Sequence, residues 1–293
     1  MWQPELINMK NILTVFLAAA FLCGCGDSKD QKNLPTPERI ALNLALGNPS
    51  NAKNDPTSEE NYLIQLPQYS LSYSRSKGIP NWVSWHLSED WIGSTARQEF
   101  FQAYTALPTG WYQVQADDYA FVANGFDRGH NCPSADRTLT VEDNTATFNM
   151  INIMPQAPMQ NQGVWANLEN YCRKLVNEGK ELYIISGNYG VGGTSNKGYR
   201  EKLANGKITV PRHLWKVIVV LPYGEDDVSR IDEKTRVIAV SIQNKDSLGD
   251  EHWGDYRVSV NEIEAATGYD LLSVLSNSIE SVIEAGVDEE QIP

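Results

Sequence analysis

Three short runs rich in β-branched residues place the strongest constraint on how this chain can fold. Each is four to six residues long and is bounded by glycine, proline or charged side chains: residues 183–186, 216–221 and 236–240. Runs of this length and composition are typical of strands buried in a sheet. Two further segments, 69–73 and 82–87, alternate in character with period two and predict a pair of antiparallel strands.

Helical patterns separate some of these strands. They cover residues 142–148, 162–178 and 261–267, and Gly268 is a suitable C-terminal stop for the last one. Strands that outnumber the helices and do not alternate regularly with them favour an α+β fold. We therefore predict a large, mainly antiparallel sheet with helices packed on it.

The first 25 residues predict a targeting segment that takes no part in the fold. Lys10 precedes an apolar run over residues 12–22 that is too short to span a bilayer comfortably. The run ends in Leu22-Cys23-Gly24-Cys25, which resembles a bacterial lipobox, so we predict cleavage before Cys25 and acylation of its thiol. An ordinary secretory leader is the alternative, and Met9 is an alternative start. Either interpretation predicts an exported protein, as a periplasmic or cell-surface lipoprotein or in secreted form.

The rest of the chain divides by composition into three parts. Residues 26–58 are rich in Lys, Asp, Asn, Pro and Ser and predict a flexible tether. Residues 59–283 carry the globular pattern, and their length favours one sizeable domain. Residues 284–293 are acidic and predict a solvated tail.

The net charge of −13 is distributed unevenly along the chain. Residues 125–216 carry 11 basic and 8 acidic side chains, whereas residues 217–293 carry 5 basic and 17 acidic ones. A local positive region on an acidic body suits a ligand gripped at one or two phosphates. A tight, sequence-specific duplex binder is expected to be more basic.

The positive region contains Asp127-Arg128-Gly129-His130. His130 is a natural general base, because a neutral imidazole accepts protons near physiological pH. Gly129 is expected to let the backbone bend so that His130 faces a groove. Asp127 is a candidate to support this turn.

A predicted helix supplies a second set of polar residues. Asn161 lies at its start, and Glu169 and Arg173 follow on the same side of the helix. One amide oxygen as the direct ligand leaves positions for water, which suits Mg²⁺ or Mn²⁺. Glu169 would act on the ion through water, or pair with Arg173 as an ordinary helix ion pair. A base, a guanidinium and a hard ion together are what phosphodiester hydrolysis requires.

These motifs closely resemble the DNA/RNA non-specific endonuclease family, whose ββα-metal core has a D-R-G-H strand and an N-Q-x-x-W-x-x-L-E helix. The second motif is present here as residues 161–169. The likeness extends through residues 82–85, 133–137 and 152–156 and covers roughly residues 45–280. Within the family, the chain looks most like the exported, sugar-non-specific type of filamentous cyanobacteria.

The resemblance implies a role for each matching residue. His130 would be the general base, Asn161 the direct ligand of Mg²⁺, with Mn²⁺ able to substitute, and Glu169 a ligand through water. The remaining catalytic candidates would contact the phosphate or support the site: Arg97, Arg128, Arg173, Asp127 and Asn152. The implied activity is cleavage of DNA and RNA with little sequence preference, leaving 5′-phosphate ends.

Cys132 and Cys172 leave three interpretations open. Export permits a disulfide between them, two buried free thiols are equally compatible, and a metal set with His130 is a third option. Asn131-Cys132 also departs from the family, in which many members carry an aliphatic residue and alanine. Redox sensitivity of the activity is therefore a question for this chain.

Two alternative functions remain at this level. One is a surface lipoprotein that keeps the fold but only binds nucleic acid, with its membrane contact made solely through the lipid on Cys25. The other is an endonuclease restricted to DNA. His86, His213 and His252 lack neighbouring motifs, so we predict structural or surface roles for them.

Overall fold

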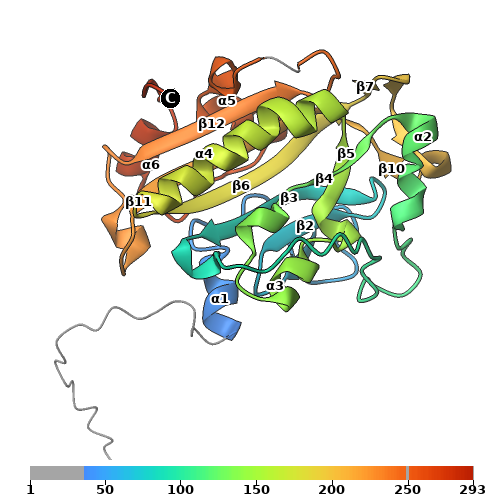
Figure 1. The fold of residues 1–293 in the computed structure, drawn as a ribbon. Coiled ribbons are helices and arrows are strands. Elements are labelled where there is room, and N and C mark those ends of the chain that lie inside the picture. Colours follow the sequence, from blue (N-terminus) through green and yellow to red (C-terminus); the bar gives the residue numbers. More distant parts are fainter. Residues whose placement is uncertain (1–35, 249–250, 293) are drawn as a thin grey trace, which may run out of the picture.

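The computed structural model describes residues 36–248 and 251–292, so the predicted leader and its Cys25 lie outside the described residues. A seven-stranded antiparallel sheet forms the centre of the fold, in the order β1-β2-β3-β6-β11-β12-β13 (Figure 1). Its strands are β1 (Tyr62–Gln65), β2 (Ser70–Ser74), β3 (Ile79–Leu87), β6 (Lys180–Val191), β11 (Pro211–Pro222), β12 (Arg236–Gln243) and β13 (Arg257–Val258).

All five predicted strand segments belong to this sheet. Residues 69–73 and 82–87 overlap β2 and β3, which pair with each other as expected. The three β-branched runs lie within the adjacent strands β6, β11 and β12. The predicted α+β class with a large antiparallel sheet is confirmed.

Three two-stranded sheets surround the central one. They pair β4 (Asp127–His130) with β5 (Ile153–Gln156), β7 (Gly193–Ser195) with β8 (Gly198–Arg200), and β9 (Lys202–Leu203) with β10 (Ile208–Thr209).

The α-helices are short except for one. They are α1 (Thr36–Leu42), α2 (Phe121–Asn124), α3 (Val141–Ala146), α4 (Ala166–Asn177), α5 (Val260–Thr267) and α6 (Asn277–Ile283). Single helical turns of the 3₁₀ type are η2 (Glu89–Trp91), η3 (Ala116–Tyr119), η4 (Ser134–Asp136), η5 (Met150–Asn152), η7 (Ala204–Gly206), η8 (Asp227–Arg230) and η9 (Trp253–Tyr256), whereas η6 (Gln160–Trp165) is π-helical.

The three predicted helices are present with shifted ends. The last begins at Val260 and stops at Gly268, whose φ of 74° is the left-handed conformation expected of a C-terminal glycine. The long helix differs from its prediction, because its first part is the π-helical η6 and the regular α-helix begins only at Ala166. π-Helical turns are rare and occur often at functional sites.

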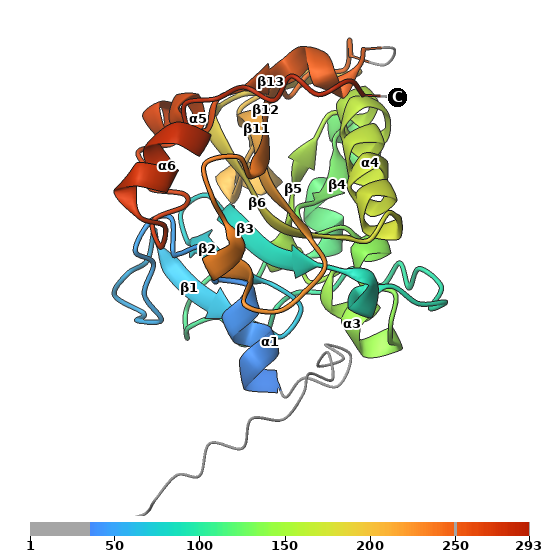
Figure 2. The same cartoon turned by 90° about the vertical axis from the view of Figure 1, so that its left-hand side faces the viewer.

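The central sheet is buried on both faces. Ile184 and Ile218 belong to one apolar cluster, whereas the adjacent residues Ile185 and Val217 belong to another, as the alternation of side chains along a strand requires. The helix α4 covers the first face, and α5 and α6 cover the second (Figure 2). The site described below lies on the α4 side.

The hairpin β4–β5 and the helix α4 form a ββα unit beside the sheet (Figure 1). The turn η6 joins β5 to α4, so one short stretch of chain carries both predicted motifs. This unit brings residues 127–130 and the start of the helix to the same place.

The segment 26–58, predicted to be a flexible tether, is part of the packed domain from residue 36 onward. It contains α1, and Leu46 and Ala52 are buried in the cluster beneath α5 and α6. The buried Asn43 side chain donates hydrogen bonds to the carbonyl groups of Leu66 and Pro67. Polar composition suggested a tether, but a few apolar residues are enough to dock the segment.

The predicted acidic tail is likewise not simply solvated, because part of it packs against the domain. Asp288 is buried against Arg236 and Arg257, with a 2.8 Å contact to Arg236 Nε. Arg236 also pairs with Glu290 at 2.6 Å.

Among the described residues, no helix is sufficiently long and apolar to cross a membrane.

Replacing Leu46 with alanine tests whether this N-terminal segment belongs to the domain. Leu46 is 3% exposed, so we expect the free energy of unfolding to fall by about 2–5 kcal/mol. Urea denaturation followed by tryptophan fluorescence measures the change. The half-exposed Val274 provides the control Val274→Ala, and equal midpoints for the two variants would show that residue 46 is not packed.

Candidate active site

The hairpin β4–β5 presents Arg128 and His130 on one side. Residues two apart on a strand share a face, and both line a cavity of about 290 Å³. A Cβ atom on the intervening Gly129 would lie 1.8 Å from Oε1 of Gln156. Glycine is therefore required by the close approach of Gln156, and not by the backbone bend expected from the sequence, since Gly129 lies within the regular strand β4.

This cavity collects six of the predicted site residues from distant parts of the chain. The hairpin, the helix α4 with its π-helical start, and the loop before η3 each contribute. The six are Arg97, Arg128, His130, Asn161, Glu169 and Arg173. The structure therefore places the two sequence motifs and Arg97 around one space.

His130 lies in an aromatic setting. Its ring meets Phe148 edge to face at 4.9 Å and Phe101 at 5.4 Å. Burial, and then the charges of Arg97 and Arg128, lower the pKa of His130 to about 3. The sequence alone suggested titration near physiological pH, whereas this environment keeps the ring neutral there. Its buried Nε2 has no hydrogen-bond partner among the described residues.

Asn152 holds the chain that follows His130. Its Oδ1 accepts a hydrogen bond from the Cys132 amide at 3.0 Å, and its Nδ2 donates to the carbonyl groups of Cys132 and Thr147. The Asn152 carbonyl accepts from Asn131. Asn152 is fully buried, so it supports the site from behind and does not line the cavity.

Asp127 orients the amide of Asn161. Its Oδ2 accepts hydrogen bonds from Asn161 Nδ2 at 2.9 Å and from Gln162 Nε2 at 2.7 Å. Because the NH₂ group of Asn161 is engaged in this way, its carbonyl oxygen is left to bind a ligand. A carbonyl oxygen beside a cavity of about 290 Å³ fits a hard divalent ion that keeps most of its waters.

Glu169 pairs with a residue that the motifs did not indicate. Its Oε1 lies 2.9 Å from Nζ of Lys216, which projects from β11 and is 1% exposed. The ammonium group also lies 4.3 Å from the ring centroid of Trp165. Burial raises the pKa of Glu169, and the charges of Lys216 and Arg173 oppose that rise. Glu169 is thus fixed at the edge of the cavity.

Arg173 is held by Asp136 and not by Glu169. Its Nη1 donates to Asp136 Oδ1 at 2.7 Å, while Asp136 Oδ2 accepts from Trp85 Nε1 at 3.1 Å. Asp136 is 1% exposed, so it anchors the guanidinium from inside the protein. The helix ion pair considered from the sequence is replaced by this cross-element contact.

The other two arginines rest on aromatic rings. Arg128 lies 4.3 Å from the ring centroid of Phe101, and Arg97 lies 5.0 Å from that of Phe148. Arg97 also donates to Ser134 Oγ at 2.7 Å. Stacking on rings leaves most of the donors of a guanidinium available to an anion.

Lys216, Asp136, Phe101 and Phe148 were not predicted as site residues. Lys216 carried a usable signal, because a charged residue at the head of a buried apolar run needs a partner. The two phenylalanines carried no such signal, since an isolated aromatic residue is usually interpreted as part of the hydrophobic core. Cys132 and Cys172 are buried free thiols, which matches the second of the three interpretations.

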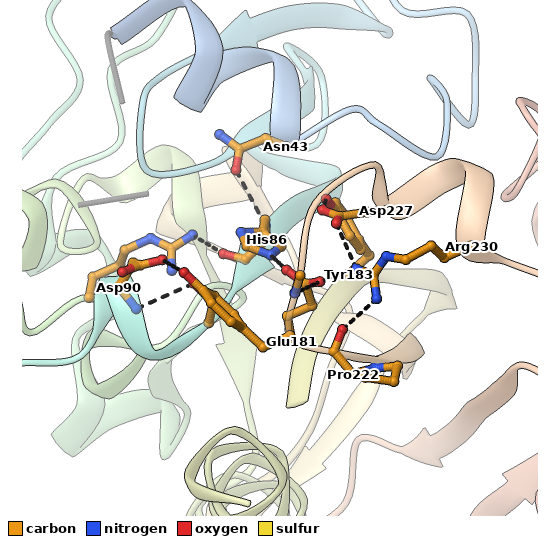
Figure 3. A network of polar contacts seen from close by, with 12 residues as sticks. Asn43, His86, Asp90, Glu181, Tyr183, Pro222, Asp227 and Arg230 are labelled. Atoms are coloured by element: carbon orange, nitrogen blue, oxygen red, sulfur yellow. Dashed lines mark hydrogen bonds and ion pairs between the residues drawn. The ribbon is translucent and has the colours of Figure 1, made fainter. Parts of the chain in front are cut away.

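A second polar group has a composition that could hold a metal. His86, Glu181 and Asp227 offer ligand atoms within 4.8 Å of one another in the interior (Figure 3). Nε2 of His86 lies 3.1 Å from Glu181, and Arg230 already bonds both carboxylates. We interpret this group as an ion-pair network, because Arg230 supplies the positive charge that the carboxylates require.

Comparisons with known proteins show the family of this chain. Residues 46–278 match the family model described as DNA/RNA non-specific endonuclease. The chain belongs to this endonuclease family. A relative named "Nuclease" from Nostoc sp. is 45% identical over 279 residues, which cover 94% of this chain and 97% of the relative.

Less similar proteins match a smaller share of this chain. The mitochondrial nuclease EXOG of Mus musculus is 28% identical over 209 residues, covering 68% of this chain and 54% of that protein. A solved structure of the EndoG/EndoGI complex matches with a TM-score of 0.67 and 22% identity, covering 83% of this chain and 95% of that one. This likeness shows that the fold is shared.

The pKa of His130 can be measured by NMR titration of its ring. With the pKa lowered from 6.5 to about 3, we expect no titration of His130 between about pH 5 and 8. The neutral ring then stabilises the fold fully above pH 6.5, and this contribution is lost as the pH falls toward 3. Arg97→Gln should raise the pKa of His130. A wild-type midpoint near 6.5 would contradict the burial argument.

The pair of Lys216 and Glu169 can be tested by a double-mutant cycle. Lys216→Met leaves a largely buried carboxylate unpaired, so we expect a loss of about 3–5 kcal/mol in the free energy of unfolding. Adding Glu169→Gln should restore most of that loss. The exposed pair Lys174 and Glu178 on the same helix is the control, and Lys174→Met should cost less than about 1 kcal/mol.

Proposed function

We propose that this protein is a divalent-metal-dependent, sugar-non-specific endonuclease. It would hydrolyse phosphodiester bonds of DNA and RNA with little sequence preference and leave 5′-phosphate ends. The observation that carries the proposal is one cavity in which a neutral His130 lies among three arginines and an oriented Asn161.

His130 acts as the general base in this proposal. Its neutral ring accepts a proton from the attacking water, and the aromatic rings around it hold its orientation. Asn152 holds the backbone just after His130 and so helps to fix the strand end that carries the ring. Proton transfer is the step that depends most directly on this one side chain.

Asn161 and Glu169 hold the ion in this proposal. The Asn161 oxygen would bind Mg²⁺ directly, with Mn²⁺ able to substitute, and Glu169 would act through water. When bound, the ion supplies positive charge against the scissile phosphate and its leaving 3′ oxygen. Asp127 keeps the amide in the orientation that this requires.

The guanidinium groups bind the phosphate and offset charge that develops in the transition state. They contact a group that every nucleotide shares, which supports activity on both DNA and RNA. The basic surplus of residues 125–216 supports the same assignment on an otherwise acidic chain. The 45% identity to a relative named "Nuclease" is the strongest support from the comparisons.

We also propose that the protein is exported. The support is the leader pattern that ends in Leu22-Cys23-Gly24-Cys25. Acylation of Cys25 would anchor the enzyme at a membrane surface and keep it away from cytoplasmic nucleic acid. Cleavage without acylation would release it instead.

His130→Ala tests the proposed activity. We expect the turnover rate on a fluorogenic single-stranded oligonucleotide to fall by about 10²–10⁴-fold, because the general base is lost. The exposed His252 gives the control His252→Ala, which should cleave at the wild-type rate. EDTA should abolish wild-type cleavage, and Mg²⁺ should restore it.

Undiminished cleavage by His130→Ala would remove the assigned base. Binding without cleavage by the wild type under every divalent ion would favour the alternative of a catalytically silent binding protein. Cleavage of DNA but not of a matched RNA strand would restrict the substrate to DNA.

A further inference from the structure

Each phenylalanine of the described residues either packs against His130 or lines a cavity together with Arg128. Phe101 and Phe148 pack against His130, and Phe126 is buried beside Arg128. Phe100 and Phe121 differ from these three, because 62% and 49% of each is exposed. Two exposed rings beside a polar site offer flat apolar surfaces to a ligand.

The exposed rings line two cavities that continue from the catalytic one. The first, of about 470 Å³, contains Phe100 and shares Arg97, Arg128 and Asn161 with the catalytic cavity. The second, of about 410 Å³, contains Phe121 and shares Arg128 with the first. The shared residues show that the three spaces adjoin one another around Arg128. Both volumes fall in the range of ~300–1,000 Å³ usual for small-ligand sites.

The backbone holds both rings in place at a cost. Glu99, which precedes Phe100, has a φ of 52°, and Ala120, which precedes Phe121, has a φ of 39°. Residues other than glycine rarely adopt this left-handed region, and such strain gathers at binding and catalytic sites. Each exposed ring therefore follows a strained residue.

The second cavity also contains an unpaired hydroxyl group. Tyr119 lines it and is 2% exposed, yet its hydroxyl has no hydrogen-bond partner among the described residues. Buried tyrosine hydroxyls usually have a partner. Burial raises the pKa of Tyr119 well above its ordinary value, so the group stays a donor.

We infer that these two cavities bind nucleobases, with Phe100 and Phe121 stacking the bases of successive nucleotides on one side of the scissile phosphate. The inference rests on the proposed nuclease function. A nucleobase has the flat face that an exposed ring stacks on. Every base has such a face, so stacking is compatible with weak sequence preference.

This site selects for unpaired nucleotides. A base within a duplex is already stacked and paired, so it must leave the helix before it can lie on Phe121. Stacking on a ring does not involve the sugar, so it should contribute equally to the binding of single-stranded DNA and of RNA. The structure therefore assigns a preference for single-stranded or locally melted substrates.

The experiment compares Phe100→Ala and Phe121→Ala with Val122→Ala. Val122 is 87% exposed, adjoins Phe121 in sequence and lines none of the three cavities. Each phenylalanine variant should raise KM for a single-stranded oligonucleotide about tenfold and reduce the ratio of single-stranded to duplex cleavage. Val122→Ala should match the wild type on both measures.

Abasic substrates give the specific readout. Removing the base that stacks should weaken wild-type cleavage about as much as Phe121→Ala does, and the two changes together should cause no further loss. A base analogue whose fluorescence falls on stacking, bound to His130→Ala so that nothing is cleaved, should be quenched by this chain and not by its Phe100→Ala/Phe121→Ala derivative.

The inference is overturned if the wild type cleaves nucleic acid while both phenylalanine variants keep its KM and its strand preference, or if abasic sites never change the rate. Absence of cleavage by the wild type is a different result and defeats the proposed function itself. Quenching of the base analogue would still reveal the base site in that case, because it measures binding alone.

Discussion

The contact between Lys216 and Glu169 links the central sheet to the active cavity. Lys216 is almost fully buried in β11, so its charge needs a partner, and Glu169 on α4 is within 2.9 Å. The apolar side of α4 packs on the same face of the sheet, and this fixes the rotation of the helix. Asn161 and Arg173 take their positions from that rotation. A neutral side chain at residue 216 would remove this charge pair and leave α4 held by its apolar side and by the contacts of Arg173 with Asp136 and of Tyr171 with Arg236.

The clustering of arginines around the active cavity has a second effect. Burial among phenylalanine rings withholds the water that would stabilise the charged form of His130, and the guanidinium groups of Arg97 and Arg128 make that form less favourable still. The same groups that are proposed to bind phosphate therefore also keep the proposed base neutral. Ser134 holds Arg97, and Asp136 holds Arg173, the third arginine of the cavity. Anion binding and the neutral state of the proposed base arise here from one arrangement of charge.

Local sequence predicted the elements better than it predicted their limits. The β-branched runs indicated β6, β11 and β12, because a strand buried on both faces consists mainly of apolar residues such as valine and isoleucine. The prediction of a flexible tether was wrong from residue 36 onward, and the prediction of a solvated tail was wrong at Asp288. Polar composition does not show which few residues of a segment pack against the domain. The π-helical turn at Gln160–Trp165 also left no trace in the periodicity, because a single wide turn shifts the phase of only one short segment. Gly129 was expected to be essential, but for a different reason from the contact with Gln156 that requires it.

The sequence by itself determined the fold class, the family and the chemical types present at the site. Those follow from residue identity and spacing, and both are local properties of the chain. Only the tertiary structure decided which charges meet: Lys216 with Glu169, Asp136 with Arg173, and Asp127 with Asn161. It also decided that His130 is buried among rings and that Phe100 and Phe121 remain exposed. These outcomes depend on which distant segments pack together and exclude water, and no local pattern contains that information.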